Sequence, residues 1–252
     1  MQLRLLRHAT LSIRYGGASV LLDPMLSAAG ARAAVEDTPN PRRNPLVELP
    51  IPVAEILKGV DAVLVTHTHS DHFDDGAAQF LPRGLPLLGQ PPDEAKFRGL
   101  GFTSVQSIAD QVTFRGITIS RTGGQHGTGE IGRNMAPVSG FVLQAPGEPV
   151  LYIAGDTIFC AEVTQALERF HPDVVVVNAG GARFLQGDPI TMTPEDVIQT
   201  CRALPKAGVV AVHMEAINHC IVTRADLAFQ LEAERLTAQV AIPADGEVAG
   251  LG

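Results

Sequence analysis

The most constraining feature of the chain is a histidine-rich segment that follows a short β-branched run. Residues 61–65, Asp-Ala-Val-Leu-Val, have the composition of a buried strand, and Thr66-His-Thr-His-Ser-Asp-His72 comes directly after them. His67 and His69 are two positions apart, so at a strand end both imidazoles point to the same side and can converge on one cation. Asp71 and His72 follow after a turn and can address a second cation nearby.

Four further histidines and aspartates lie in a sequence context similar to that of the histidine-rich segment. They are a histidine in a glycine-rich loop, an aspartate and a histidine that each follow a predicted strand, and one more histidine six residues later: His126, Asp156, His213 and His219. Taken singly, each has the alternative of a core histidine or a capping aspartate. Together, positions at strand ends and in a glycine loop can meet at one rim of a layered fold, because glycine permits close approach of the backbone.

The remaining pattern predicts two strand-rich halves, each with helices. Three apolar runs within residues 3–22 are separated by turn signals, and residues 173–242 alternate strand and helix, with Thr193 and Thr223 as N-caps. Residues 27–52 are rich in proline and predict a long loop or lid, and residues 127–137 a second loop. We therefore predict an α/β fold, a four-layer αββα sandwich of two mixed β-sheets, as a single domain over residues 1–252.

Composition narrows the function classes. The 252 residues are 45% hydrophobic and 18% charged, which is typical of a globular protein, and the net charge of −8 disfavours nucleic-acid binding. Three cysteines, widely spaced, suit a reducing compartment better than a disulfide scaffold. With no apolar run of signal-peptide or membrane-span length, we expect a cytoplasmic protein that does not contact membranes.

These residues, in this order, resemble the metallo-β-lactamase-fold hydrolases. That family has a strand ending in aspartate, then H-x-H-x-D-H, a lone histidine, an aspartate after a strand and a final histidine after a strand. The matching positions are Asp23, His67, His69, Asp71, His72, His126, Asp156 and His213. The resemblance covers nearly the whole chain and implies a first metal ion on His67, His69 and His126. It also implies a second ion on Asp71, His72 and His213, with Asp156 bridging the two.

Within the superfamily, two segments look like the branch of ascorbate-6-phosphate lactonase. They are Arg7-His-Ala-Thr10, before the first hairpin, and Leu21-Leu-Asp-Pro24. We expect neither the helical C-terminal region of the glyoxalase II enzymes, because residues 224–235 predict a single helix, nor the flavin domain of the flavodiiron proteins. The proline and arginine segment at residues 39–45 is short compared with the RNA-binding arm of tRNA-maturation nucleases.

The resulting hypothesis is a dinuclear, metal-dependent hydrolase. Its substrate is a small ester, lactone or phosphate-bearing metabolite, attacked by a metal-activated water. Zinc is the first candidate metal, with manganese, iron and nickel open. Two dications add roughly +4 locally, so an anionic substrate remains compatible with the acidic chain. A phosphodiesterase or nuclease of the same fold and a non-catalytic binding module are the alternatives, and a homo-oligomer is left open.

The catalytic candidates are Asp71, for positioning water and moving protons, and His219 as the second. Asn218 is a candidate for a hydrogen bond to substrate, with a simple turn as the alternative. Two residues of the loop at residues 180–188 are left open as substrate contacts, Arg183 and Asp188. For His8 the pattern slightly favours an ordinary strand-end residue over a role near the site.

Overall fold

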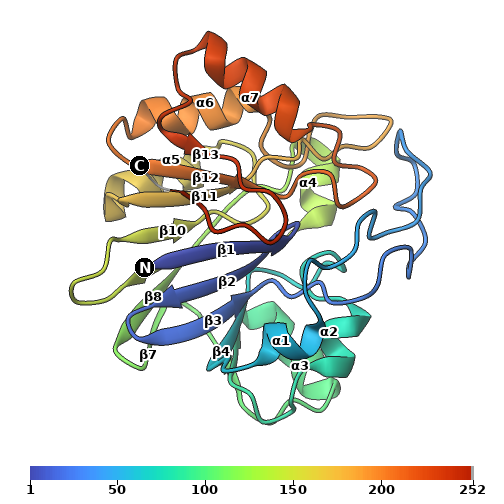
Figure 1. The fold of residues 1–252 in the computed structure, drawn as a ribbon, viewed down its shortest axis with the longest axis vertical. Helices are drawn as coiled ribbons and strands as arrows, with labels where there is room; N and C mark the ends of the chain where they lie inside the picture. The colour runs from blue at the N-terminus through green and yellow to red at the C-terminus, as the bar shows by residue number, and fades with distance from the viewer. Residues whose placement is uncertain (251–252) are drawn as a thin grey trace.

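The computed structural model describes residues 1–250, which form two β-sheets packed face to face with helices outside (Figure 1). The first sheet has six strands in the order β1 (Gln2–Arg7), β2 (Thr10–Tyr15), β3 (Ala18–Leu22), β4 (Ala62–Val65), β5 (Leu87–Gly89) and β6 (Val105–Ser107). The second has seven in the order β13 (Val240–Ala241), β12 (Gly208–Val212), β11 (Val174–Asn178), β10 (Leu151–Ile153), β9 (Gly140–Gln144), β8 (Ile117–Thr122) and β7 (Gln111–Phe114).

Both sheets are mixed. In the first sheet β1, β2 and β3 pair antiparallel, and β3 to β6 pair parallel. In the second sheet β10 to β13 are parallel, whereas β7 to β10 are antiparallel. The predicted sandwich of two mixed sheets with helices is thus confirmed. The expectation rested on two strand-rich halves of the chain that each carry helices, because a sheet must bury its apolar face against another layer.

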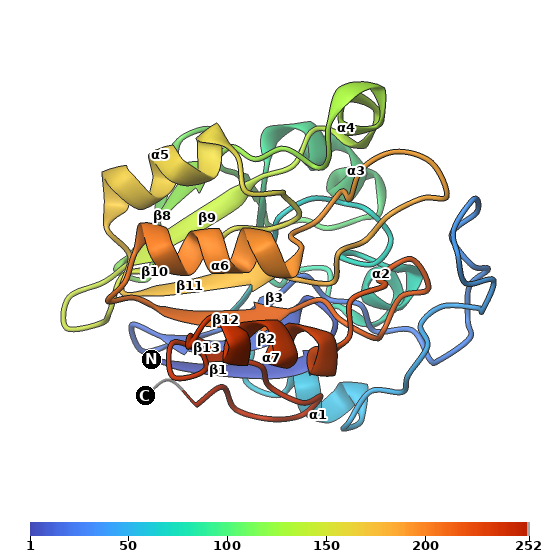
Figure 2. The ribbon, with the colours of Figure 1, turned by 90° about the horizontal axis from the view of Figure 1, so that it is seen from above.

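The core lies between the sheets and on their two outer faces. Alternate residues of β1, Leu3 and Leu5, point inward and pack against residues of the opposite sheet such as Val210 and Val212. The outer face of the first sheet is covered by α1 (Val53–Leu57), α2 (Asp75–Phe80) and α3 (Glu94–Gly99), the last of which follows a 3₁₀ turn at Pro91–Asp93. The outer face of the second is covered by α5 (Ala161–Phe170), α6 (Pro194–Ala203) and α7 (Arg224–Ala233) (Figure 2).

The helix starts predicted at Thr193 and Thr223 are both present. Each threonine hydroxyl accepts a hydrogen bond from the backbone N–H three residues on, and the carboxylate of the aspartate there, Asp196 or Asp226, accepts one from the backbone N–H of the threonine. The loop expected at residues 127–137 is wrong in part, because α4 (Gly129–Met135) forms there. This seven-residue helix contains two glycines and buries none of its residues, so it carries no amphipathic signal.

Residues 27–52 form the predicted long loop, which extends from the same end of the sandwich as α4 (Figure 1). Asn218 holds this loop in place. Its side-chain amide donates to Asn40 O and Thr38 Oγ1 at 2.6 and 2.7 Å and accepts from the Val35 N–H at 2.9 Å. Across residues 1–250, no helix has both the length and the apolar character that a bilayer span requires.

Candidate metal centre

The histidine and aspartate side chains predicted from the sequence meet at one rim of the sandwich. In the first sheet β1, β3 and β4 run in the same direction, and in the second sheet β8, β10 and β12 do so. The residues that follow these six strands therefore lie at corresponding edges of the two sheets. In strand order they include His8, Asp23, His67, His126, Asp156 and His213.

Three imidazoles form what we call the first cation site: His67, His69 and His126. One ring nitrogen of each lies within 4.8 Å of the others. His67 Nε2 lies 3.0 Å from His69 Nδ1, and the Nδ1–H of His126 donates to the carbonyl of Ile190 at 2.8 Å. That hydrogen bond leaves the Nε2 lone pair of His126 free to face the other two rings.

The second cation site consists of Asp71, His72 and His213. The two Nε2 atoms are 3.3 Å apart, and Asp71 Oδ2 lies 3.6 Å from His213 Nε2 and 3.8 Å from His72 Nε2. Nitrogens bound to one zinc ion at about 2.0–2.1 Å are roughly 3.3–3.4 Å apart in tetrahedral geometry. The spacing and the donor types therefore fit a divalent cation at each site.

Asp156 lies between the two sites and is 2% exposed. Its Oδ2 is 3.4 Å from His126 Nε2 of the first site and 3.2 Å from His72 Nε2 of the second. Its Oδ1 is 3.2 Å from His213 Nε2 and accepts a hydrogen bond from Asn178 at 2.6 Å. One carboxylate thus reaches ligands of both sites, which is the arrangement a bridging ligand requires.

Asp23, at the end of β3, orients the second site. Its carboxylate accepts from the backbone N–H and the hydroxyl of Thr66, both at 2.7 Å, and from His72 Nδ1 at 2.8 Å. The last bond keeps the Nε2 of His72 directed toward Asp71 and His213. A carboxylate behind a ligand histidine is the usual way in which proteins select its tautomer.

The charges in the cluster are strongly coupled. Burial disfavours ionised Asp156, but His213, His72 and His126 outweigh it and hold its pKa well below the usual range. Burial likewise opposes the imidazolium of His72, yet Asp156, Asp71 and Asp23 keep its pKa well above the usual value. Burial, together with the neighbouring His72, lowers the pKa of His67, which is therefore neutral at pH 7.

His8 joins the cluster although the sequence pattern slightly favoured an ordinary strand-end residue. It is fully buried, and one of its ring nitrogens lies within 4.8 Å of the ligand atoms of the second site. Burial and the neighbouring His213 lower its pKa to about 3. Its position directly after β1 is the same signal that singled out His213 after β12, so strand-end position could have found it.

The other candidates have different surroundings. His219 is buried beside Phe184, with ring centroids 6.3 Å apart, and burial lowers its pKa to about 4. It belongs to none of the groups of potential ligands within residues 1–250. Arg183 donates to Gly187 O within its own loop, and the carboxylate of Asp188 accepts from the hydroxyl of Thr128, directly before α4. The amide of Asn218, a candidate for substrate binding, is instead engaged with the loop at residues 27–52.

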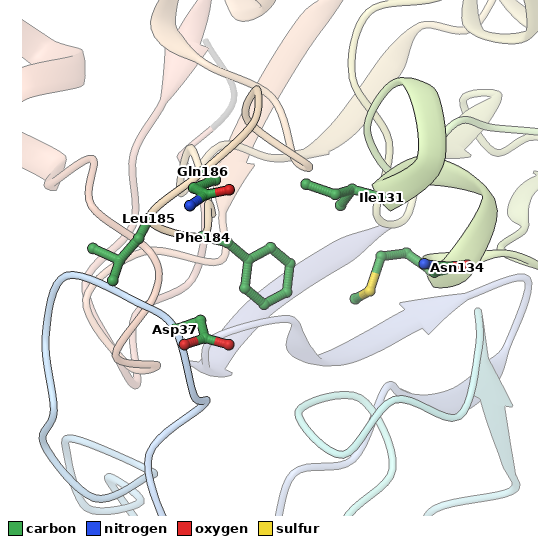
Figure 3. Close-up of a pocket in the computed structure, with 7 residues that line it drawn as sticks. Asp37, Ile131, Asn134, Phe184, Leu185 and Gln186 are labelled. Atoms are coloured by element: carbon green, nitrogen blue, oxygen red, sulfur yellow. The ribbon is translucent and has the colours of Figure 1, made fainter.

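A cavity of about 470 Å³ adjoins the loops that carry these residues (Figure 3). Its lining comes from the loop at residues 27–52, from α4 and from the loop before α6: Asp37, Ile131, Asn134, Met135, Phe184, Leu185 and Gln186. Phe184 stacks on His219, whose pKa is sensitive to the charges of Asp71 and Asp156. The cavity is mostly apolar, and none of its seven lining residues is basic.

The fold and the cluster define a metal-dependent hydrolase of the metallo-β-lactamase fold, and comparison with known proteins agrees. The beta-lactamase superfamily domain matches residues 19–214, and the chain belongs to this family. The UPF0173 protein YddR of Bacillus subtilis (strain 168) is 37% identical over 250 residues, 98% of each chain. A UPF0173 metal-dependent hydrolase of Azorhizobium caulinodans is 26% identical over 258 residues, again 98% of each chain.

Two solved structures are similar over their whole length. A possible metal-dependent hydrolase from Veillonella parvula DSM 2008 has a TM-score of 0.95 and 34% identity, covering 98% of both chains. An isothiocyanate hydrolase from Delia radicum gut bacteria has a TM-score of 0.94 and 38% identity, covering 99% of this chain and 100% of that one. The chain is thus a metal-dependent hydrolase with the UPF0173 proteins among its relatives.

Proposed function

We propose that the protein hydrolyses a small, uncharged electrophile with an apolar substituent, and that an isothiocyanate is the first substrate to test. The observation that carries this proposal is an apolar cavity whose lining includes Ile131, Met135, Phe184 and Leu185. The cavity is linked to the His/Asp cluster through Phe184, whose ring stacks on His219, and the charges of Asp71 and Asp156 act on His219. An apolar substituent is stabilised by burial against such side chains. The similar isothiocyanate hydrolase provides a second line of support.

The reaction needs one water. Water adds to the central carbon of R–N=C=S, the C–N bond breaks, and the products are the amine R–NH₂ and carbonyl sulfide. Divalent cations held by the two sites, with zinc as our first candidate, supply a Lewis acid and make water more acidic. The lone pairs of the imidazoles and the oxygens of Asp71 and Asp156 are the groups that hold them.

The chain itself contributes proton transfer and substrate orientation. We assign Asp71 the role of positioning the attacking water and moving its proton. Its carboxyl is ionised, because His72 and the hydrogen-bonded His213 and His8 outweigh burial and hold its pKa well below the usual range. An ionised carboxylate beside the reacting atoms can accept that proton. We assign His219 the second catalytic role, a contact with the entering substrate, because its ring stacks on Phe184, which lines the cavity.

A lactone or simple ester is the second candidate, as the resemblance to the ascorbate-6-phosphate lactonase branch suggests. A phosphate-bearing substrate has less support, because the cavity lining contains Asp37 and no basic side chain. The same argument, with the net charge of −8, disfavours a phosphodiester of a nucleic acid.

The test is a substrate panel assayed with protein reconstituted with Zn²⁺ or Mn²⁺. We expect release of benzylamine from benzyl isothiocyanate, slower hydrolysis of an uncharged δ-lactone, and none of bis(p-nitrophenyl) phosphate. Replacing the aromatic ring in the cavity, Phe184→Ala, should raise KM for benzyl isothiocyanate about tenfold. Phe229→Ala, on the exposed face of α7, is the matched control. Hydrolysis of bis(p-nitrophenyl) phosphate, with no hydrolysis of benzyl isothiocyanate or the lactone, would contradict the proposal.

A further inference from the structure

His8 makes three contacts to the second cation site. Its Nε2 lies 3.1 Å from Asp71 Oδ2, its ring lies over the ring of His213 with centroids 3.6 Å apart, and its backbone carbonyl accepts the His213 N–H at 2.9 Å. Because a carboxylate can only accept, His8 Nε2 is the donor. With its proton on Nε2, the ring leaves Nδ1 as an unprotonated acceptor, and that atom has no partner among residues 1–250.

The backbone around His8 is held in a single arrangement. His8 has φ of +61°, a left-handed conformation that histidine adopts more readily than most residues. On one side, the buried guanidinium of Arg7 donates to the carbonyls of Met25 and Ser27 at 2.7 and 2.8 Å. On the other, the Thr10 hydroxyl donates to the carbonyl of Asp23 at 2.7 Å. The imidazole is therefore placed by a rigid segment, so its position relative to Asp71 is set before any cation binds.

The stacking distinguishes a positioning residue from a ligand. The lone pair of His213 Nε2 points outward in the plane of its ring, whereas the ring of His8 is packed on the ring of His213, with centroids 3.6 Å apart and the two planes tilted by 37°. The direct neighbour of His8 Nε2 is instead a carboxylate oxygen at hydrogen-bond distance. The geometry fits a group that orients Asp71 and His213 from behind.

We propose that His8 is a positioning residue for the second cation site, where it fixes the carboxylate of Asp71 and the ring of His213. His8 therefore sets the cation affinity of the second site and leaves that of the first site unchanged. This inference rests on the two-cation centre of the proposed function. Hydrogen-bond partners behind metal ligands are typically worth about 10- to 100-fold in metal affinity.

The experiment titrates metal-depleted full-length protein with Co²⁺ and follows its visible absorption, with Zn²⁺ competition as a second readout. His8→Asn is the main variant, because asparagine tolerates the left-handed backbone but its amide is too short to reach Asp71. We expect the second equivalent of Co²⁺ to bind about 10- to 100-fold more weakly and the first to bind as before. His8→Gln carries a donor on a longer side chain and should restore most of that affinity.

His171→Asn is the matched control. His171 also has a positive φ, +45°, but it is exposed at the end of α5. We expect it to bind both equivalents like the unmodified protein.

The outcomes separate this inference from the proposed function. If the unmodified protein takes up a single equivalent, the two-cation centre itself is wrong. If it takes up two and the folded His8→Asn protein binds both with unchanged affinity, the role of His8 is wrong. Equal weakening of both equivalents indicates a general structural effect and overturns the proposal. The proposal is also overturned if the second site of His8→Gln binds Co²⁺ as weakly as that of His8→Asn, because the hydrogen-bond donor is then irrelevant.

Discussion

The two cation sites are built from similar ligands but are supported by different parts of the chain. In the first site His126 is oriented by a main-chain carbonyl, that of Ile190, and only the neutral hydroxyl of Thr66 lies near His67, 3.1 Å from its Nδ1. In the second site the support comes from side chains, with Asp23 behind His72 and His8 behind Asp71. A main-chain carbonyl stays in place when its residue is substituted, whereas a side-chain partner can be removed. Affinity and pH response should therefore vary more easily at the second site than at the first.

The largest effect is expected for the residue that the two sites share. Asp156→Ala removes the carboxylate that approaches His126 and His72 from between them, so we expect fewer than one tightly bound cation per chain. Turnover should fall by about 10³-fold or more, a scale typical of losing a catalytic group. Metal analysis and kinetics on the same preparation measure both effects. His69→Ala, which affects the first site alone, should retain one cation. Two cations on Asp156→Ala would mean that the sites do not share this ligand.

Asp23→Asn should affect the second site more than the first, which Asp23 reaches only indirectly, through the Thr66 hydroxyl beside His67. The amide of asparagine can still accept from Thr66, but its N–H₂ then faces His72 Nδ1, which favours the wrong tautomer. We expect the Zn²⁺ affinity of the second site to fall about 10- to 100-fold and that of the first site to fall less. Competition with a chromophoric chelator measures each affinity. Asp75→Asn, at the exposed start of α2, is the control. If Zn²⁺ affinity fell at the first site alone, Asp23 would support the first site and not the second.

The two sites should also differ in proton release. In the metal-free protein the pKa of His72 is raised well above its usual value by Asp156, Asp71 and Asp23, against the effect of burial, so this ring is protonated at pH 7. The pKa of His67 is lowered by burial, so that ring is already neutral. A cation needs the neutral ring, so only the second site must expel a proton.

Affinity at the second site should therefore rise about tenfold per pH unit near pH 7, while the first changes little. Calorimetric titration in two buffers of different ionisation enthalpy measures the protons released. Release of the proton with the first equivalent instead of the second would show that the ring of His72 is not the source.

The smallest effect is expected at Cys220, whose Sγ lies 3.5 Å from His213 Nδ1. A thiol is a weak donor and acceptor, so Cys220→Ala should weaken the second site by less than about fivefold. Cys201→Ala, which removes the thiol that α6 buries in the core, serves as the reference. A loss as large as that of Asp23→Asn would place the thiol among the main supports of the second site.

The sequence by itself predicted the layered fold and the residues that the structure gathers at the rim. His67, His69, Asp71 and His72 are close in the chain and follow one buried strand, so local backbone geometry already places them together. The sequence also predicted His126, Asp156 and His213, because each follows a recognisable strand or lies in a glycine-rich loop. Helix starts at Thr193 and Thr223 were predictable because capping depends on residues within four positions.

Only the tertiary structure assigned roles to the residues whose partners are distant in sequence. His8 lies 63 residues before Asp71, and Asn218 lies 183 residues after Val35, so neither contact has a local signature. The sequence therefore predicted an ordinary strand-end residue for His8 and a substrate contact for Asn218. The cavity is likewise formed by three segments that meet only in the fold. Strand and cap patterns depend on neighbouring residues, whereas the supports of the metal centre depend on which strand ends the two sheets bring together.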